Sequence, residues 1–344
     1  MNSTSKKMVI IFVPGLMGTE LKRDSDNLQL WPTKTYAKLK KLSLDKNGKD
    51  YLENKASPGT VIKTMDVGIN IYKKFFDHIN KIGNYKENIN LFPVAYDWRK
   101  DIEDESFRVK EKIDEVLGKG NAKIVIVAHS MGGLLVRSFL LKFPSYFSLI
   151  EKIFFCGTPH LGAPVALDMV YNGTNLPQIF WHSKDNISLI TTNFPSIYQL
   201  MPSSKYRYQN QNDFFYNNNM RNSDTSQITV KTLNQLMINK SRDFHERLDD
   251  GWDKSRWSNK AFFLVSQSRN TITTIELNKN NDKQIKVIYS YGKGDGRVSI
   301  DSAIPDFLID NKEKQVFYFD EKHDQILSNK LVIKKILELI EITD

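Results

Sequence analysis

The sequence contains only one cysteine, Cys156, in 344 residues. The chain therefore cannot form an internal disulfide, and a lone thiol within the apolar segment 153–156 indicates a buried core residue rather than a reactive group. Apolar runs are short as well. The first, residues 8–13, is too short for a signal-peptide core, and no run approaches the length that spans a bilayer. These absences predict a cytoplasmic protein, with or without peripheral contact with a membrane.

Two further absences narrow the class of function. The net charge is +9, but the lysines and arginines are scattered and no nucleic-acid-binding motif accompanies them. We therefore expect no nucleic-acid partner. Histidines and acidic residues nowhere show the spacing of metal ligands, so we expect neither a metal nor another cofactor.

The most informative segment that is present is 128–133, with the sequence AHSMGG. It follows four β-branched residues, 124–127, and a helical pattern begins at Gly132. A strand that enters a helix through small-x-Ser-x-Gly is the nucleophile elbow of an α/β-hydrolase, which requires small residues two before and two after the serine. Ala128 and Gly132 meet that requirement. Ser130 is therefore the predicted nucleophile, and the alternative is a serine that caps an ordinary helix.

An activated serine needs a base and an acid, which follow it in this fold in the order acid, then histidine. Asp295 follows a predicted strand, 285–291, and lies between glycines that permit a turn aiming its carboxylate along the edge of the sheet. His323 lies in the loop after the last predicted strand, 315–319, where the base is expected. The alternatives are a turn aspartate and a surface histidine. Two other carboxylates are kept as fallback acids, Asp301 and Asp320.

The oxyanion formed during acyl transfer needs two backbone N–H donors. One is expected from the residue after the nucleophile, Met131, and the other from the loop after an early strand. The strand 8–13 is followed by the glycine-containing loop 14–18, in which the Leu16 amide is the predicted donor. The alternative for this loop is a plain β-turn.

Six short motifs occur in one order along the chain, and together they resemble the lecithin:cholesterol acyltransferase family, which includes lysosomal phospholipase A2 and phospholipid:diacylglycerol acyltransferases. The resemblance extends over residues 8–165 and 285–327 and is patchy between them. It implies that Ser130, Asp295 and His323 match the family's catalytic triad, and that Leu16 and Met131 match its oxyanion amides. The motifs are 13–18 (VPGLMG), 30–32 (LWP), 96–99 (YDWR), 128–133 (AHSMGG), 157–164 (GTPHLGAP) and 294–296 (GDG).

The sequence departs from the family's pattern in two ways. Arg297 stands where the family usually has threonine, which changes the charge beside the acid. The secreted members of the family carry disulfides, which this chain cannot form internally.

Apolar strands alternate with amphipathic helices, which predicts an α/β fold with a doubly wound, mostly parallel sheet, as in α/β-hydrolases. Residues 1–165 and 261–344 form the predicted core, with a lipid-contacting insert at about 22–66. Residues 166–260 have no clean periodicity and form the predicted cap or lid. Helices are expected at 70–83, 107–117 and 331–340, and a hairpin turn at 278–282.

A cationic segment carries the prediction of membrane contact. Trp31 is followed by Lys34, Lys38, Lys40 and Lys41, with aromatic and aliphatic residues between them. A tryptophan at head-group depth beside lysines is typical of a peripheral enzyme on an anionic lipid surface. The alternative is an ordinary solvated amphipathic helix.

Together these features favour a serine-dependent lipid acyl hydrolase that acts through an acyl-enzyme on an ester lipid, with transfer to an alcohol as a second outcome. Two alternatives remain. A soluble carboxylesterase or thioesterase on short acyl substrates would make the cationic segment incidental. A lipid-binding module without catalysis would make the triad incidental.

Overall fold

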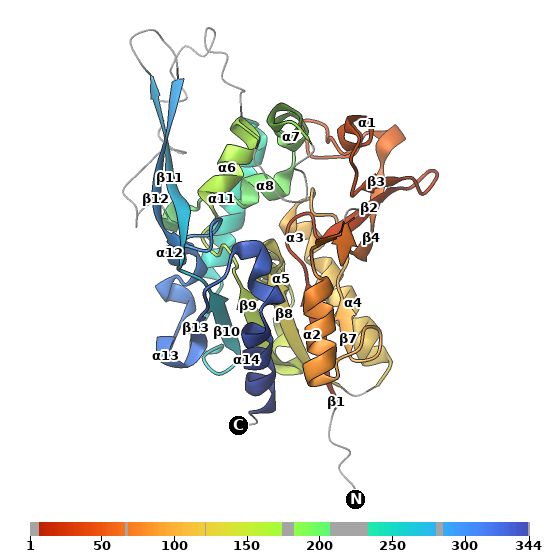
Figure 1. The fold of residues 1–344 in the computed structure, drawn as a ribbon, viewed down its shortest axis with the longest axis vertical. Coiled ribbons are helices and arrows are strands. Elements are labelled where there is room, and N and C mark those ends of the chain that lie inside the picture. Colours follow the sequence, from red (N-terminus) through yellow and green to blue (C-terminus); the bar gives the residue numbers. More distant parts are fainter. Residues whose placement is uncertain are drawn as a thin grey trace, which may run out of the picture.

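The computed structural model describes residues 7–65, 68–120, 122–173, 182–206, 233–279 and 285–342. At its centre, six strands follow the order β13-β10-β9-β8-β1-β7, and every neighbouring pair is parallel (Figure 1). The predicted parallel sheet is therefore confirmed. Its strands are β1 (Lys7–Val13), β7 (Leu91–Pro93), β8 (Ala122–His129), β9 (Ile150–Cys156), β10 (Ala261–Val265) and β13 (Val316–Tyr318).

Both faces of this sheet are buried, which is why its strands are apolar without alternation. Successive side chains of a strand point to opposite faces. In β1, Ile11 packs into one hydrophobic cluster, with α4 (Phe107–Gly118) and α5 (Met131–Lys142), whereas Phe12 packs into another. The second cluster contains α2 (Lys73–Gly83) and α14 (Lys330–Glu341), which cover the opposite face (Figure 1). Cys156 is buried in the second cluster, as expected of an apolar residue.

The expected helices are present, with small differences at their ends. The helix predicted over 70–83 begins at Lys73, because residues 69–70 form the short strand β6 (Ile69–Asn70). It ends at Gly83, as predicted, and the next residue, Asn84, adopts the left-handed conformation that commonly terminates helices. The last helix begins after Asn329, whose side chain accepts the N–H of Leu331 and caps the helix.

One strand lies outside the central sheet, contrary to the expectation that it would end at the sheet's edge. Over the described chain, β12 (Ile285–Gly294) pairs with β11 (Arg269–Lys279) in a separate antiparallel sheet. The long ladder between the two strands supplies their backbone hydrogen bonds, so no partner in the central sheet is needed. Part of the predicted turn, 280–282, lies outside the described residues. Asp295 therefore reaches the site from a hairpin.

The segment between β1 and α2 forms a small layer of its own. Its strands follow the order β3-β2-β4 and pair in antiparallel fashion, and its helix, α1, packs against α7 (Lys184–Thr191). The elements of this layer are β2 (Thr19–Arg23), β3 (Gln29–Trp31), α1 (Tyr36–Lys40), β4 (Ala56–Val61) and β5 (Thr64–Met65).

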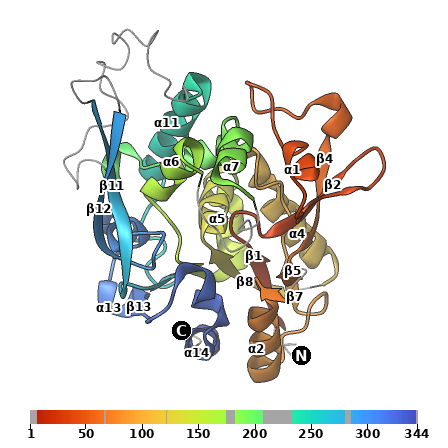
Figure 2. The same ribbon diagram turned by 45° about the horizontal axis from the view of Figure 1, so that its top comes forward.

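Helices cover the carboxyl ends of the central strands (Figure 2). In the part of the predicted cap that the structure describes, α11 (Gln235–Asp250) packs on α8 (Pro195–Gln199), and α8 packs on α6 (Pro164–Tyr171). No clean period is visible in this segment of the sequence, because α11 is largely polar and buries only a narrow set of side chains.

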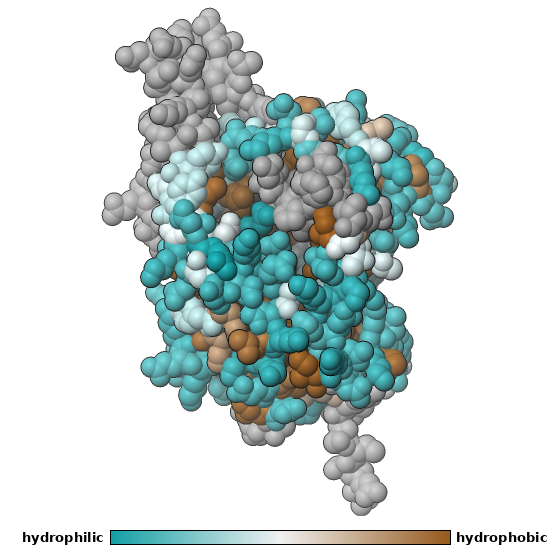
Figure 3. Space-filling model, in the orientation of Figure 1, coloured by the Kyte–Doolittle hydropathy of each residue, from teal (hydrophilic) through white to brown (hydrophobic). Residues whose placement is uncertain are grey.

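Hydrophilic residues cover most of the face in Figure 3, and apolar residues form small separate groups on it. Among the described residues, no helix is both long enough and apolar enough to cross a bilayer.

Candidate active site

Ser130 lies at the sharp turn between β8 and α5. Its backbone has φ 54° and ψ −128°, a conformation that is strained for a residue with a side chain and that places it above the sheet. The turn needs glycine at 132, because a Cβ there would lie 2.5 Å from the Val13 carbonyl oxygen. A Cβ at Gly15 would likewise lie 2.8 Å from the Ser130 Cβ. The first loop and the serine turn therefore fit together only through glycines.

The structure brings Ser130, His323 and Asp295 together. His323 Nε2 lies 2.8 Å from Ser130 Oγ, and His323 Nδ1 lies 2.7 Å from Asp295 Oδ2. Because the carboxylate can only accept, Nδ1–H donates to Asp295 and Nε2 accepts the serine hydroxyl. The main chain adds a third bond, from the His323 N–H to the Asp295 carbonyl at 2.9 Å.

Asp295 is buried but remains the charged partner of the histidine. Burial alone would raise its pKa, but His323 and the N–H groups of Val298 and Arg297 lower the pKa below its usual value. Those two N–H groups donate to Oδ1 at 2.8 and 2.9 Å. The two fallback acids lie elsewhere: Asp301 is exposed, and Asp320 forms an exposed ion pair with Arg269.

The backbone N–H groups of Leu16 and Met131 are not used in hydrogen bonds within the described chain. The Gly15 carbonyl accepts the Gly18 N–H at 3.0 Å, and in a trans peptide the next N–H, that of Leu16, points the opposite way. Met131 is the first residue of α5, where N–H groups have no partner within the helix. Among the described residues, neither N–H has an acceptor.

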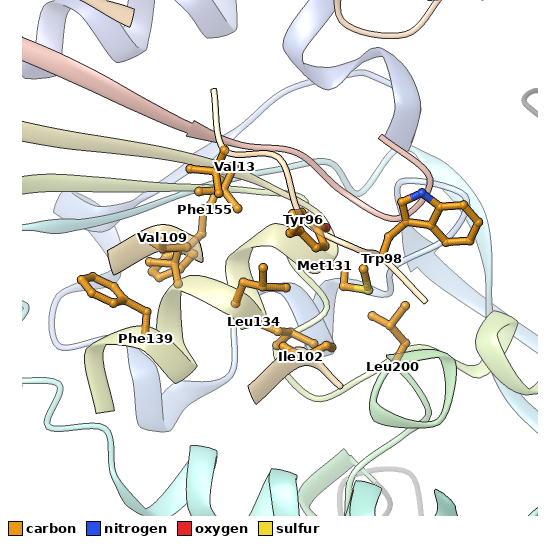
Figure 4. Packing of buried hydrophobic residues seen from close by; sticks show 14 of the residues in the cluster. Val13, Tyr96, Trp98, Ile102, Val109, Met131, Leu134, Phe139, Phe155 and Leu200 are labelled. Atoms are coloured by element: carbon orange, nitrogen blue, oxygen red, sulfur yellow. The ribbon is translucent and has the colours of Figure 1, made fainter. Parts of the chain in front are cut away.

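Three aromatic side chains donate hydrogen bonds to main-chain carbonyls of the first loop and of the first residue of β2. Tyr96 Oη donates to the Pro14 carbonyl at 2.8 Å, Trp31 Nε1 to that of Met17 at 3.0 Å, and Trp98 Nε1 to that of Thr19 at 3.0 Å. Figure 4 shows Tyr96, Trp98 and Met131 in the same buried cluster. The loop carbonyls are thus bonded within the core.

The prediction that Trp31 lies at a lipid surface is therefore wrong. Its side chain is 0% exposed, its ring packs edge-on against Trp98 at 5.5 Å, and its single N–H is satisfied by Met17. The four lysines do lie toward solvent: Lys34 and Lys40 are exposed, and Lys38 and Lys41 are partly buried.

A second hydrogen-bond chain joins the first loop to His323. The Gly15 N–H donates to Tyr72 Oη at 2.8 Å, and Tyr72 Oη lies 2.8 Å from His129 Nδ1. His129 Nε2 lies 3.0 Å from the His323 carbonyl, so Nε2–H must donate and Nδ1 must accept from Tyr72. Burial and His323 lower the pKa of His129 to about 3, so the ring stays neutral.

His129 is adjacent to Ser130 in the motif, and nothing in the sequence assigns it a role. In the structure its ring bonds the carbonyl of His323, in the loop after the last strand. No local sequence pattern indicates the role of Tyr72, because its partners Gly15 and His129 are each 57 positions away along the chain.

A cavity of about 300 Å³ opens at these groups and is lined by Ser130 and His323. Its lining includes the apolar residues Leu16, Val165, Met169, Ile197 and Leu200. It also includes the polar residues Lys74, Arg297, Asp324 and Gln325. The cavity can hold a substrate that has both an apolar chain and a polar group.

A parallel sheet with a strained serine between its central strand and the next helix defines an α/β-hydrolase. The chain belongs to the lecithin:cholesterol acyltransferase family, whose sequence model matches residues 51–322.

Curated relatives in Arabidopsis thaliana support this membership. The phospholipase A(1) LCAT3 is 30% identical over 136 residues, which cover 37% of this chain and 30% of the relative. The lecithin-cholesterol acyltransferase-like 4 protein is 29% identical over 139 residues, which cover 36% of this chain and 25% of the relative. The matches thus span less than a third of either relative's length.

A solved structure shares the fold over the whole chain. A chain of the Tle4–Tli4 complex superposes with a TM-score of 0.60 at 11% identity, covering 98% of this chain and 99% of that one. This likeness concerns the fold alone.

Proposed function

We propose that this protein is a serine-dependent lipid acyl hydrolase. The observation that carries the proposal is the continuous hydrogen-bond chain Ser130–His323–Asp295 at the wall of a cavity that is largely apolar. Membership of the lecithin:cholesterol acyltransferase family and the phospholipase relative support a lipid ester as the substrate.

The first half-reaction forms an acyl-enzyme. Ser130 Oγ attacks the ester carbonyl while its proton moves to His323 Nε2, and Asp295 stabilises the resulting imidazolium. The carbonyl oxygen becomes an oxyanion, which the N–H groups of Leu16 and Met131 stabilise. The tetrahedral intermediate collapses, the C–O bond to the alcohol breaks, and the alcohol leaves with the proton from His323.

The second half-reaction returns the serine. Water gives its proton to His323 and attacks the acyl carbonyl, and the fatty acid leaves as Ser130 recovers its proton. A second alcohol in place of water would give a new ester, which is acyl transfer. The apolar wall formed by Val165, Met169 and Ile197 favours a long acyl chain over a short one.

Hydrolysis of esters of increasing chain length, with and without liposomes, tests this function. We expect turnover to rise with chain length and to increase when the lipid is presented in an interface. If short soluble esters were turned over as fast as long ones, and if liposomes did not change the rate, the protein would instead be a soluble carboxylesterase or thioesterase. Binding to lipid without any turnover would identify a binding module.

We also propose that the layer around α1 contacts an anionic lipid surface. Its lysines, Lys34, Lys38, Lys40 and Lys41, lie toward solvent. With Trp31 buried, the exposed apolar side chains of this layer are Tyr36, Tyr51 and Leu52, of which Leu52 is 94% exposed. Cations beside exposed apolar groups suit the interface of an anionic membrane.

Replacement of all four lysines by glutamate is expected to weaken binding to anionic liposomes severely. Each lysine near such a surface contributes about 1 kcal/mol, and the glutamates would be repelled. Hydrolysis of vesicle-borne lipid should slow, and turnover of a small soluble ester should change little because these residues lie outside the cavity lining. The salt dependence of liposome binding should also flatten.

A matched control exchanges four other lysines for glutamate: Lys312, Lys314, Lys330 and Lys334. These residues are exposed on α13 (Lys312–Gln315) and α14, at the other end of the molecule from α1 (Figure 1). The change in net charge is the same. Equal loss of liposome binding in both variants would reject a contact at α1 in favour of a general charge effect.

Substitution Tyr72→Phe is expected to lower kcat about 10- to 100-fold with little change in KM. The lost hydroxyl accepts the Gly15 N–H and donates to His129, and each buried partner left unsatisfied costs about 1–3 kcal/mol. The pH profile should stay that of wild type, since Asp295 still orients His323. Tyr85→Phe removes the hydroxyl of a buried tyrosine outside this hydrogen-bond chain and serves as the control. Similar kinetic losses in both variants would contradict a positioning role for Tyr72.

A further inference from the structure

Two cations line the cavity without a part in the chemistry proposed above. Arg297 comes two residues after Asp295, and its backbone N–H donates to Asp295 Oδ1 at 2.9 Å, so the turn that sets the acid also sets this residue. Lys74 is the second residue of α2 and lines the same cavity. Ser130 and His323 line this cavity too.

The Arg297 guanidinium differs from the buried guanidinium groups elsewhere in the molecule. Arg99 pairs with Asp97 and Asp50, and Arg137 pairs with Asp249. Arg297 is partly buried, yet among the described residues its side chain forms no hydrogen bond or ion pair.

Burial lowers the pKa of Arg297, although the fields of Asp324 and Asp295 oppose that change. A desolvated cation without a partner carries a free-energy cost that an anionic ligand would offset.

The charged side chains that line the cavity leave a positive balance. Asp324 lines the cavity as well, but over the described chain it forms no ion pair with Arg297 or Lys74. Asp295 is already bonded to His323 and to two backbone N–H groups. Two cations against Asp324 leave one net positive charge, which matches the single negative charge of a phosphodiester.

We propose that Arg297 and Lys74 form a phosphate subsite, at which a glycerophospholipid substrate places its phosphodiester. This inference rests on the proposed acyl hydrolase function and assigns the residues of this chain that recognise the phosphate. A guanidinium binds phosphate oxygens through two parallel N–H groups, and a lysine adds a point charge. The phosphate of a glycerophospholipid lies only a few bonds from its ester carbonyls, so both can occupy one cavity. The acyl chain then lies along Val165, Met169 and Ile197.

The test compares kcat/KM for phosphatidylcholine, whose phosphodiester is balanced by the choline so that the lipid has no net charge, and for a diacylglycerol with the same acyl chains. Both lipids are presented in neutral detergent micelles, so that surface charge does not enter the comparison. The wild type should prefer the phospholipid. In Arg297→Met the ratio of the two values should fall about 10- to 100-fold, the range expected for a charge-assisted hydrogen bond. Arg297→Lys should retain part of the preference, and Lys74→Met should reduce it.

Lys293→Met is the matched control, because Lys293 is an exposed cation on the same strand that does not line the cavity. An unchanged ratio in Arg297→Met and Lys74→Met, or an equal fall on both lipids, would overturn the subsite. Because Lys74 is exposed on α2, its variant keeps the test valid if Arg297 variants do not fold.

Free phosphate is a different occupant of the same cations. Inhibition by millimolar inorganic phosphate, without any preference for the phospholipid, would overturn the assignment to substrate. Absence of turnover of either lipid by the wild type would instead refute the proposed hydrolase function.

Discussion

Substitution Ser130→Ala is expected to lower kcat for ester hydrolysis by about 10⁶-fold, which is the effect of removing the nucleophile from a serine triad. Without Oγ no acyl-enzyme forms, and His323 has no hydroxyl to deprotonate. The N–H donors of Leu16 and Met131 would still stabilise an oxyanion, so a small residual rate over water is expected. Steady-state hydrolysis of a chromogenic ester measures the loss.

The fold should survive this change, because alanine keeps the small volume of serine and relieves no packing contact. A fluorophosphonate probe should label wild type at Ser130 alone and should leave Ser130→Ala unlabelled. Ser299→Ala is the control for loss of a buried serine hydroxyl elsewhere. Ser299 is buried, and its side chain accepts the N–H of Ser302. Labelling at another serine, or unchanged turnover in Ser130→Ala, would refute the assignment of the nucleophile.

The sequence predicted the central sheet and the serine turn because both depend on short-range chemistry. Four β-branched residues lie in the buried part of β8, and Gly132 is required because a Cβ there would collide with the Val13 carbonyl. The order of Asp295 and His323 after the serine follows from the topology of the fold, so two distant loops could be paired on chain order alone.

Other features depend on contacts that no local pattern encodes. Trp31 was expected at a lipid surface because lysines follow it, but its indole N–H bonds the Met17 carbonyl and its ring packs on Trp98. An amphipathic side chain near cations has the same local signal whether it faces a core or a membrane. Only the contacts with Met17 and Trp98, which are distant in sequence, decide between them.

The same reasoning explains the strand that precedes Asp295. A run of β-branched and aromatic residues predicts a strand, but not the sheet to which it belongs. Pairing of β12 with β11 gives a hairpin outside the central sheet, and β13 takes the edge position beside β10. The acid therefore arrives on a separate hairpin, although its position in the chain order is the expected one.

Asp295 is not the only carboxylate after the serine, so the substitution Asp295→Asn needs two controls, at Asp301 and Asp320. Asp301→Asn and Asp320→Asn should change kcat less than twofold, because Asp301 is exposed and Asp320 pairs with Arg269 away from His323. If either change proved more damaging than Asp295→Asn, the assignment of the acid would be wrong.

Substitution Asp295→Asn is expected to lower kcat by about 10⁴-fold, as loss of the acid does in a serine triad. Oδ1 accepts the N–H groups of Arg297 and Val298, so the asparagine carbonyl would keep that position and its NH₂ group would face His323 Nδ1. The amide would then donate to Nδ1, which moves the ring proton to Nε2. His323 in that tautomer cannot accept the Ser130 proton, and no carboxylate stabilises the imidazolium. Steady-state hydrolysis of a soluble ester measures kcat, and proton NMR of the ring N–H distinguishes the two tautomers.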